Sequence, residues 1–447
     1  MNFNETQINK LSDRTRQLEN ENTELKKLAY LDYETGLFNK YYMFNIAPKE
    51  LKKSNFYNNL MVLIDILSLN HIEAYYGTEL KTDLVKKMAS VLKSELCENS
   101  IIGRVDNENM LLLLPNWNLE KLMSYLECCT SSLGDVRYLS QIVTGHVNVI
   151  TYTCWNPFED SIHKGYNECK LAISYAKSIN NYLPVKFEEK MRTEFERKSV
   201  IVSSIDKSIK EDNFEIWFQG KYDSSKKRII GYEALSRWKY SEQEYISPAE
   251  FIPLINQSNR FIRFSKYILN KSILAFEELA ASENERITLS LNISPNFFVS
   301  REFIPYLEEL IIESYLESSQ IILEITEDVF IGDYSQIIKQ IDLLHTQGFS
   351  ISLDDFGSGY SSLSHVSYIN INEIKIDRSI VSQIRTEEKS CLIIKVIVLL
   401  AKNLGLNVVA EGVEEVEEVE LLKTFGITIF QGYFYSKPKP VNQLIYE

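Results

Sequence analysis

In the C-terminal half of the sequence, seven apolar runs each end in residues whose side chains can bind a metal ion or a phosphate group. These residues are Glu233, Asn292, Glu324, Asp354 with Asp355, Lys375, Glu411 and Gln431. If the five carboxylates share one site, they repel one another by on the order of several kcal/mol, so protons or cations must neutralise most of them. Divalent metal ions can do this, and oxygen ligands without clustered His or Cys favour Mg²⁺ or Mn²⁺ over zinc.

Such a site suits the hydrolysis of a phosphodiester. Two divalent ions about 3.5 to 4 Å apart, bridged by a shared carboxylate, can clamp a phosphoryl group and activate water at neutral pH. Any one of these residues could instead be structural, because most surface carboxylates do no chemistry and an Asn at a strand end is usually a turn former. The recurrence of polar residues at seven strand ends favours a common site.

The elements that must position these side chains have the pattern of a barrel. From residue 200 onward, eight β-rich runs occur, most of them separated by helix-length amphipathic segments. They cover residues 214–220, 229–235, 287–294, 321–327, 350–357, 373–377, 407–414 and 427–433. Eight strands with helical crossovers in about 250 residues predict an α/β fold of the TIM-barrel type, whose active sites lie at the carboxyl ends of the strands.

The first two runs depart from this alternation. The polar segment YDSSKKR between them leaves no room for a crossover helix, so they are expected to form an antiparallel hairpin. Symmetric pairing about that turn places Gln219 nearly opposite Glu233. The first strand of the barrel is therefore predicted to run antiparallel to its neighbours.

Residues 197–447 resemble the EAL domain, the cyclic di-GMP phosphodiesterase family. The resemblance rests on EALSRW at 233–238, followed in order by SPAEFIPL, LNIS, LEITE, DDFGSGYSSL, EIKIDRS, VVAEGVE and FQGYFYSKP. It implies metal ligation by Glu233, Asn292, Glu324, Asp354 and Asp355, with Glu411 serving the second metal or its water. It further implies that Lys375 holds the attacking water and the phosphate, and that Glu327 anchors the loop after Asp355. The implied substrate-binding residues are Gln219, Leu235, Arg237, Glu414 and Gln431, with Arg237 pairing with a phosphate.

One departure from the family pattern comes early in the domain. The family's Gln-Pro-Ile is here Gln219-Gly220-Lys221. Loss of the proline frees the backbone, and we expect the lysine to add a cation near a phosphate-binding rim. No metal ligand is lost, so hydrolysis is expected to survive.

Residues 30–190 show a mixed pattern that predicts an α/β sandwich. Helices are expected near 39–53, 71–96 and 158–179, with a further helix after residue 115, and strands at 60–66, 100–105, 110–115 and 141–151. Asp106 to Asn109 form a tight turn between the second and third strands. The charged stretch 186–199 is predicted to be a helical connector.

This region, over about residues 28–190, resembles the GGDEF domain of diguanylate cyclases through LDYETGLFNK and LIDILSLNHIEAYYG. Its signature hairpin has become Asp106-Asn107-Glu108-Asn109, where side chains and a negative charge replace the glycines that admit nucleotide phosphates. The family's guanine-reading positions fall on Glu73 and Thr82, the second metal-binding Asp on Leu67, and the R-x-x-D product motif on 97–100, which has neither Arg nor Asp. Only Asp65 and Glu108 remain as plausible ligands, and the hairpin is most simply a turn. We expect a degenerate, regulatory domain; whether it still binds GTP stays open.

The N-terminus has one seam of a seven-residue repeat. Its members are Ile8, Leu11, Leu18 and Leu25. A short coiled coil and hence a homodimer is one interpretation. An ordinary exposed helix is the other, because Thr15 and Asn22 occupy the alternate seam positions.

Composition sets the broad class of the protein. A net charge of −14 argues against bulk nucleic-acid binding, and six cysteines without C-x-x-C spacing indicate reduced thiols. The N-terminus has no signal-peptide pattern, and the most apolar later segment, 391–410, is interrupted by Lys395 and Lys402, so no membrane span is expected. A cytoplasmic protein is predicted.

These observations give one leading hypothesis. We expect a coiled-coil helix over 1–28, a degenerate GGDEF domain over 29–190, a helical linker over 191–199 and an EAL domain over 200–447. The EAL domain is expected to linearise cyclic di-GMP to pGpG with Mg²⁺ or Mn²⁺. The alternative is a non-catalytic cyclic di-GMP receptor that acts through protein partners.

Overall fold

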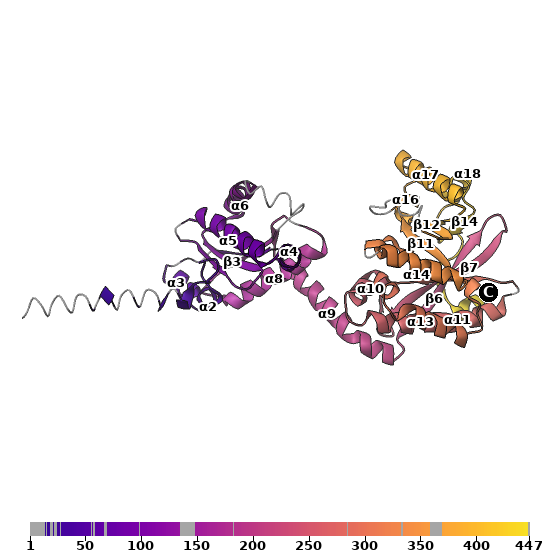
Figure 1. Cartoon of the computed structure of the whole chain (residues 1–447), viewed down its shortest axis with the longest axis horizontal. Coiled ribbons are helices and arrows are strands. Elements are labelled where there is room, and N and C mark those ends of the chain that lie inside the picture. Colours follow the sequence, from indigo (N-terminus) through magenta and orange to yellow (C-terminus); the bar gives the residue numbers. More distant parts are fainter. Residues whose placement is uncertain are drawn as a thin grey trace, which may run out of the picture. The chain divides into compact units, whose positions relative to one another are not determined.

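The computed structural model describes residues 28–54, 56, 59–66, 69–97, 99–134, 148–181, 183–283, 285–331, 334–357 and 369–445, together with residues 14, 16, 17, 21, 25 and 26. The chain divides into two compact units, Met1–Arg197 and Lys198–Glu447 (Figure 1). Three of the four residues of the predicted N-terminal seam, Ile8, Leu11 and Leu18, lie outside the described residues.

The first unit is built on a five-stranded sheet with the strand order β2-β3-β1-β4-β5. Its strands are β1 (Asn59–Ile66), β2 (Ile101–Arg104), β3 (Asn109–Pro115), β4 (Asn148–Trp155) and β5 (Val185–Lys186). Its helices are α2 (Lys40–Asn45), α3 (Ala47–Lys53), α4 (Leu69–Tyr76), α5 (Thr78–Ser94), α6 (Leu119–Gly134) and α8 (Ile162–Ser178). All strand pairs are antiparallel except β4 with β5.

The central strand β1 is buried along its whole length because both faces of the sheet are covered. Leu60, Val62 and Ile64 pack into one apolar core, and Met61 and Leu63 pack into another. Successive strand residues point to opposite faces, so a continuous apolar run fills two cores. The sandwich expected from the sequence is confirmed.

Several predicted bounds differ from the structure. The helix expected over 71–96 is two helices, α4 and α5, because Gly77 between them has a φ of 87°, a conformation that interrupts a right-handed helix. The helix expected near 39–53 is also divided, at Ile46, and Pro48 lies in the first turn of α3, where its missing N–H costs nothing. Of the strand expected over 141–151, residues 141–147 lie outside the described residues, and β4 continues to Trp155.

The predicted connector at 186–199 begins later and extends further than expected. Helix α9 runs from Glu189 to Lys210. Its later residues Ile201, Ile205 and Ile209 are buried against Phe214 and Trp238 of the second unit. This i, i+4, i+8 apolar stripe makes the end of α9 part of that unit's core.

The second unit is a closed barrel of eight strands (Figure 1). The strands are β6 (Phe214–Asp223), β7 (Arg228–Lys239), β9 (Thr288–Asn292), β10 (Ile321–Thr326), β11 (Ser350–Phe356), β12 (Glu373–Ile376), β13 (Asn407–Glu411) and β14 (Ile429–Gln431). Two short strands that the sequence did not predict, β8 (Tyr245–Ile246) and β15 (Lys439–Pro440), extend the sheet. The TIM-barrel prediction is confirmed.

Strand β6 runs antiparallel to both of its barrel neighbours, β7 and β14, whereas the remaining neighbouring barrel strands pair in parallel. In the hairpin of β6 and β7, Gln219 lies directly opposite Glu233. Both features were predicted from the length of the turn. Strand β6 therefore starts at the end of the barrel where the other strands finish, and it runs toward the opposite end.

Helices cover the outside of the barrel and connect its strands. They are α10 (Pro248–Asn256), α11 (Phe261–Ser282), α12 (Pro295–Phe298), α13 (Phe303–Glu313), α14 (Tyr334–Thr346), α16 (Arg378–Val381), α17 (Glu388–Leu404), α18 (Val416–Thr424) and α19 (Val441–Ile445), with 3₁₀ turns η1 (Ser318–Gln320) and η2 (Glu327–Ile331). None of the helices among the described residues is long and apolar enough to span a bilayer.

Candidate functional site

The polar residues that end the barrel strands meet at one end of the barrel, as their positions predicted. The register sets Asn292 beside Glu324 and Glu411 beside Gln431, while Gln219 faces Glu233 across the hairpin. These residues come from six different strands. The parallel strands place their carboxyl ends at the same edge, so residues far apart in the chain become neighbours.

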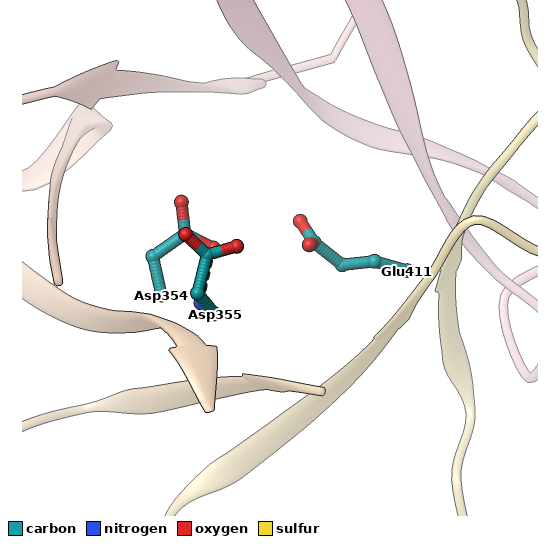
Figure 2. A group of neighbouring side chains, drawn as sticks. All are labelled: Asp354, Asp355 and Glu411. Atoms are coloured by element: carbon teal, nitrogen blue, oxygen red, sulfur yellow. Dashed lines mark hydrogen bonds between the residues drawn. The ribbon is translucent and has the colours of Figure 1, made fainter. Parts of the chain in front are cut away.

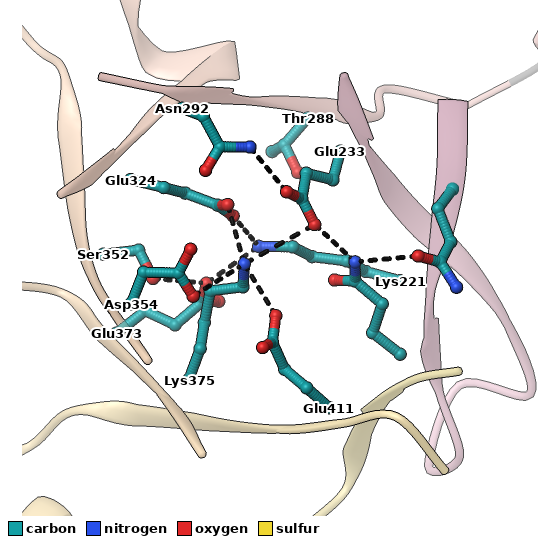
Figure 3. Close-up of polar contacts among 12 residues, drawn as sticks. Lys221, Glu233, Thr288, Asn292, Glu324, Ser352, Asp354, Glu373, Lys375 and Glu411 are labelled. Atoms are coloured by element: carbon teal, nitrogen blue, oxygen red, sulfur yellow. Dashed lines mark hydrogen bonds and ion pairs between the residues drawn. The ribbon is translucent and has the colours of Figure 1, made fainter. Parts of the chain in front are cut away.

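Lys375 lies at the centre of this group (Figure 3). Its Nζ is 2.7 Å from Glu324 Oε2, 2.7 Å from Glu411 Oε1, 3.0 Å from Asp354 Oδ1 and 3.5 Å from Glu233 Oε2. The side chain is 1% exposed. Burial alone would lower the pKa of Lys375, but the four carboxylates outweigh burial and raise this pKa well above its usual value.

Glu233 is held by amide groups on two sides. Asn292 Nδ2 donates to Glu233 Oε1 over 2.6 Å, and Gln431 Nε2 donates to Glu233 Oε2. Gln431 Nε2 also lies 3.3 Å from Gln219 Oε1. The buried Oε1 of Gln431 has no hydrogen-bond partner among the described residues, which leaves an acceptor for a ligand.

Asp354 and Asp355 are consecutive, yet both carboxylates face Glu411 (Figure 2). In a regular strand they would point to opposite faces. Here the pairing of β11 with β12 shifts between Leu353 and Phe356, and Asp355 has a φ of 53°, in the left-handed region. Oxygens of Asp354, Asp355 and Glu411 therefore lie within 4.8 Å of one another, close enough to hold one metal ion.

Two carboxyls of this group, Asp355 and Glu411, have raised pKa values, as expected for acidic side chains crowded together without a bound cation. Loss of hydration and the neighbouring Asp354 and Asp377 raise the pKa of Asp355 to about 6. Loss of hydration, reinforced by Asp354 and Glu233, outweighs the attraction of Lys375 and raises the pKa of Glu411 to about 8. A divalent cation would favour the ionised form of both groups. The oxygen-rich ligand set fits Mg²⁺ or Mn²⁺.

A cavity of about 320 Å³ opens above these residues. All five predicted substrate-binding residues line it, namely Gln219, Leu235, Arg237, Glu414 and Gln431. A second cavity of about 350 Å³, lined mainly by apolar side chains such as Ile252, Phe264 and Ile268, adjoins it at Glu233, Leu235 and Arg237. The geometry therefore brings together acidic residues, one buried lysine and one arginine beside space for a ligand.

Three predicted site residues do not line this first cavity: Asn292 lines the second cavity, Glu324 is buried against Lys375, and Glu327 lines neither cavity. Glu327 begins the 3₁₀ turn η2 and is not among the described residues that line the cavity. Residues 358–368, which include most of the loop that it is predicted to anchor, lie outside the described residues. Its role as an anchor stays a prediction.

The expectation for Lys221 is wrong. Instead of adding a cation at the rim, Lys221 points into the barrel and is 2% exposed (Figure 3). Its Nζ lies 2.8 Å from Glu324 Oε1 and 2.9 Å from Glu373 Oε1. Because β6 is antiparallel, residues after Gln219 lie deeper in the barrel, and period-two alternation puts Lys221 on the same face as Gln219. That signal was present in the sequence.

Two residues that line the cavity, Arg378 and Gly412, were missed by sequence reasoning. Arg378 follows the predicted strand EIKID and pairs through Nη2 with Glu414 Oε1 at 2.6 Å. A Cβ at Gly412 would lie 2.2 Å from Arg378 Cγ, so only glycine at position 412 leaves room for the Arg378 side chain.

Gly220, in place of the family's proline, donates its N–H to Ser436 Oγ at 3.2 Å. A proline could not make that bond.

In the first unit, the residues at the predicted nucleotide positions contact other side chains of the same unit. Glu73 accepts from Lys81, and Thr82 Oγ1 donates to Glu34 Oε1 over 2.7 Å. Asp65, a predicted ligand, is buried with Lys177 Nζ 2.8 Å from its Oδ1. These contacts occupy the groups that would otherwise read a nucleotide.

The altered hairpin of the first unit forms a turn that is stabilised by hydrogen bonds to the Asp106 side chain. Asp106 Oδ1 accepts from the backbone N–H groups of Glu108 and Asn109, at 3.0 and 2.8 Å, and from Asn109 Nδ2 at 2.6 Å. This is the pattern of an Asx turn. It supports the interpretation of Asp106 to Asn109 as a turn between β2 and β3.

Comparison with known proteins matches both units to families. The family model of the EAL domain matches residues 202–438, and the model of the diguanylate cyclase GGDEF domain matches residues 29–161. MucR of Pseudomonas aeruginosa, described as a bifunctional diguanylate cyclase/cyclic di-GMP phosphodiesterase, is 22% identical over 426 residues, which cover 95% of this chain and 62% of that protein. The chain thus spans less than two thirds of that relative's length.

Two solved structures share the architecture. The PaMucR phosphodiesterase in its c-di-GMP complex is 27% identical, with a TM-score of 0.52 over 55% of this chain and 99% of that chain. The S helix-GGDEF-EAL portion of LapD from Vibrio cholerae, bound to c-di-GMP, is 17% identical, with a TM-score of 0.58 over 94% of this chain and all of that one (100%). At this identity the second likeness concerns the fold alone.

Proposed function

The chain belongs to the EAL-domain family, and from this premise we propose that its barrel hydrolyses cyclic di-GMP to linear pGpG. The observation that carries the proposal is the convergence of Glu233, Glu324, Asp354 and Glu411 on Lys375, below a cavity lined by Arg237. Relatives in this family include phosphodiesterases of cyclic di-GMP, and a solved neighbour holds that nucleotide.

Two divalent ions, Mg²⁺ or Mn²⁺, complete the proposed site. Their ligands would be Glu233, Asn292, Glu324, Asp354 and Asp355, with Glu411 on the second ion. The raised pKa values of Asp355 and Glu411 and the all-oxygen donor set support this assignment. When bound, the ions would supply Lewis-acid polarisation of the phosphoryl group and activation of water.

Side chains of the barrel would bind the substrate and stabilise the charge that develops during hydrolysis. Lys375, whose ammonium is fixed by neighbouring strands, would donate to the phosphoryl oxygens as negative charge grows on them. Arg237 lines the cavity and would pair with a phosphate of the substrate, while its guanidinium lies 5.5 Å from the ring of Trp217. Gln219 and Gln431 would orient the nucleotide through amide groups that are already hydrogen-bonded to each other.

The first domain is proposed to be regulatory. Its nucleotide-contacting positions carry Glu73, Thr82 and Asp106, and their contacts are made within the domain. Cyclisation of GTP is therefore not expected from it. Residual binding of GTP at Asp65 and Glu108 would have to displace Lys177 from Asp65.

We also propose that the protein acts as a homodimer. Helix α17 exposes an apolar stripe in which Leu392, Val396 and Leu399 are 55%, 51% and 62% exposed. Their i, i+4, i+7 spacing puts them on one face of the helix, opposite the buried Ile394 and Ile397. The face is suited to pairing with the same face of a second copy.

One experiment tests the hydrolytic function. Purified protein is incubated with cyclic di-GMP and Mg²⁺ or Mn²⁺, and the products are separated by chromatography. We expect pGpG to form, and to form only with metal. A protein that binds cyclic di-GMP but leaves it intact under all of these conditions would be a receptor, and the proposal would fall.

A further inference from the structure

A second layer of polar residues lies beneath the proposed metal ligands. It consists of Lys221 from β6, Ser352 from β11 and Glu373 from β12, which are 2%, 0% and 6% exposed. On the parallel strands, Ser352 and Glu373 precede Asp354 and Lys375 by two residues, so alternation places them on the same inward face one layer lower. None of these three residues has a part in the mechanism proposed above.

The members of this layer are joined to one another. Lys221 Nζ lies 2.9 Å from Glu373 Oε1, and Ser352 Oγ donates to the same oxygen over 3.0 Å (Figure 3). Burial by itself would lower the pKa of Lys221, but attraction by Glu324 and Glu373 raises it above its usual value. A buried ammonium is costly unless it is paired in this way.

The layer reaches the proposed metal site through Glu324. This carboxylate is buried, and its two oxygens have different partners: Oε1 is 2.8 Å from Lys221 Nζ, and Oε2 is 2.7 Å from Lys375 Nζ. Lys375 lines the cavity and contacts the proposed ligands Glu233 and Asp354, whereas Lys221 does not line the cavity and lies below them. Lys221 therefore fixes the rotation of the carboxylate and keeps Oε1 engaged on the side away from the cavity.

We propose that Lys221 is a positioning residue, braced by Glu373 and Ser352, which holds Glu324 so that this carboxylate offers a metal ion only its Oε2 oxygen. The inference rests on the proposed function and deepens it. Loss of a group that orients a metal ligand typically costs about 10- to 100-fold in metal affinity or activity. The lysine acts through Glu324 and does not itself touch the metal or the substrate.

The test removes the contact without leaving a charge unpaired. In the double variant Lys221→Met with Glu373→Gln, one positive and one negative group are replaced by neutral groups of similar shape. We expect a melting temperature within a few degrees of wild type, a Mn²⁺ dissociation constant raised about 10- to 100-fold, and a kcat lowered by about tenfold or more. KM for cyclic di-GMP should change less than about threefold. Mn²⁺ binding is read from the electron paramagnetic resonance signal of the free ion, independently of turnover.

Two further variants isolate the contact. Glu373→Gln alone keeps Lys221 beside Glu324 and should weaken Mn²⁺ binding by at most about threefold. The matched control Lys266→Met with Glu302→Gln removes an exposed pair of the same domain, 2.6 Å long, and should leave Mn²⁺ binding and turnover as in wild type.

The outcomes separate this inference from the proposed function. Unchanged Mn²⁺ affinity in the folded double variant, or tighter binding through loss of the repelling ammonium, would overturn the positioning role even if the wild type hydrolyses cyclic di-GMP. Weakened Mn²⁺ binding with no hydrolysis by the wild type would keep the positioning role and reject the hydrolase. If the double variant does not fold, Lys221→Leu with Glu373→Gln takes its place; failure of both to fold would make Lys221 a structural residue and reject the proposal.

Discussion

Lys375 and Glu324 stand on barrel strands separated by β11, and Lys375 Nζ lies 2.7 Å from Glu324 Oε2 with both side chains buried. The same ammonium is within 3.5 Å of three more carboxylates. In the absence of metal, neutralising these acids is one role that the contacts support. In the catalytic role proposed for Lys375, the same ammonium also donates a hydrogen bond to the phosphoryl group.

Replacement of Lys375 by Ala should separate these roles. We expect kcat to fall by roughly two to three orders of magnitude, the typical loss for one preorganised donor, while cyclic di-GMP still binds through the metals and Arg237. Single-turnover hydrolysis, calorimetric binding and a melting curve provide the measurements, with Lys266→Ala, on the outside of the barrel, as the control. Equal hydrolysis rates would remove Lys375 from the mechanism, and joint loss of binding and stability would make it purely structural.

Replacement of Glu233 by Ala should abolish hydrolysis. The variant removes a proposed ligand and the carboxylate that accepts from the amides of Asn292 and Gln431. Chelation of divalent ions should abolish the activity of the wild type in the same way, reversibly. Glu242→Ala, at an exposed position, is the matched control and should keep full activity. Wild-type turnover in Glu233→Ala would show that the two-metal assignment is wrong.

GTP should not be converted to cyclic di-GMP. The reason is that Glu73, Thr82 and Asp106 stand at the nucleotide-contacting positions of the first domain and are engaged within it. The assay uses the Glu233→Ala variant, so that any cyclic product would accumulate and not be hydrolysed. Detection of cyclic di-GMP by chromatography would contradict the regulatory role of this domain.

The β2–β3 hairpin should lose protection in acid. Partial burial would raise the pKa of Asp106, but the Asn109 amide, the Lys170 ammonium and two backbone N–H groups outweigh it and lower this pKa below its usual value. A depressed pKa stabilises the fold above the ordinary value of about 3.8 and loses this contribution as pH falls through the folded value. The protection factors of residues 101–115, which compare the measured hydrogen exchange with the intrinsic rate at the same pH, should therefore fall below about pH 4.

The variant Asp106→Asn tests the cause of that acid sensitivity. Its neutral amide can still accept hydrogen bonds but carries no charge, so the protection factors in the hairpin should depend less on pH between about 5 and 3 than they do in wild type. Asp342→Asn, on α14, should leave the hairpin's pH dependence unaltered. The same pH dependence in Asp106→Asn and wild type would show that Asp106 is not responsible.

The protein should have the mass of a dimer in light scattering at micromolar concentration. The stripe of Leu392, Val396 and Leu399 on α17 supplies an apolar face, and charge placed in its middle should oppose pairing. Val396→Lys with Leu399→Lys is expected to shift the mass toward that of a monomer. Leu274→Lys, which charges an equally exposed leucine on α11, is the control. A dimer that survives the double substitution would place the interface elsewhere.

Much of the proposed site could be anticipated because it depends on short-range rules. The alternation of strands and helices placed polar strand ends such as Glu233, Glu324 and Glu411 at one edge, and the barrel brings them together. A turn too short for a helix made β6 antiparallel and fixed the pairing of Gln219 with Glu233. Turn length and period-two alternation can be read directly from the chain.

The sequence by itself therefore determined the barrel, the order of its strands and the set of acidic and amide groups at its mouth. Only the tertiary structure decided which groups touch. Lys221 meets Glu324 and Glu373 across 103 and 152 residues of chain, and Asp355 turns toward Glu411 through a left-handed residue at a shift in register. Such contacts depend on how strands stagger and close around a common interior, where burial makes each unpaired charge costly, and no local pattern specifies that arrangement.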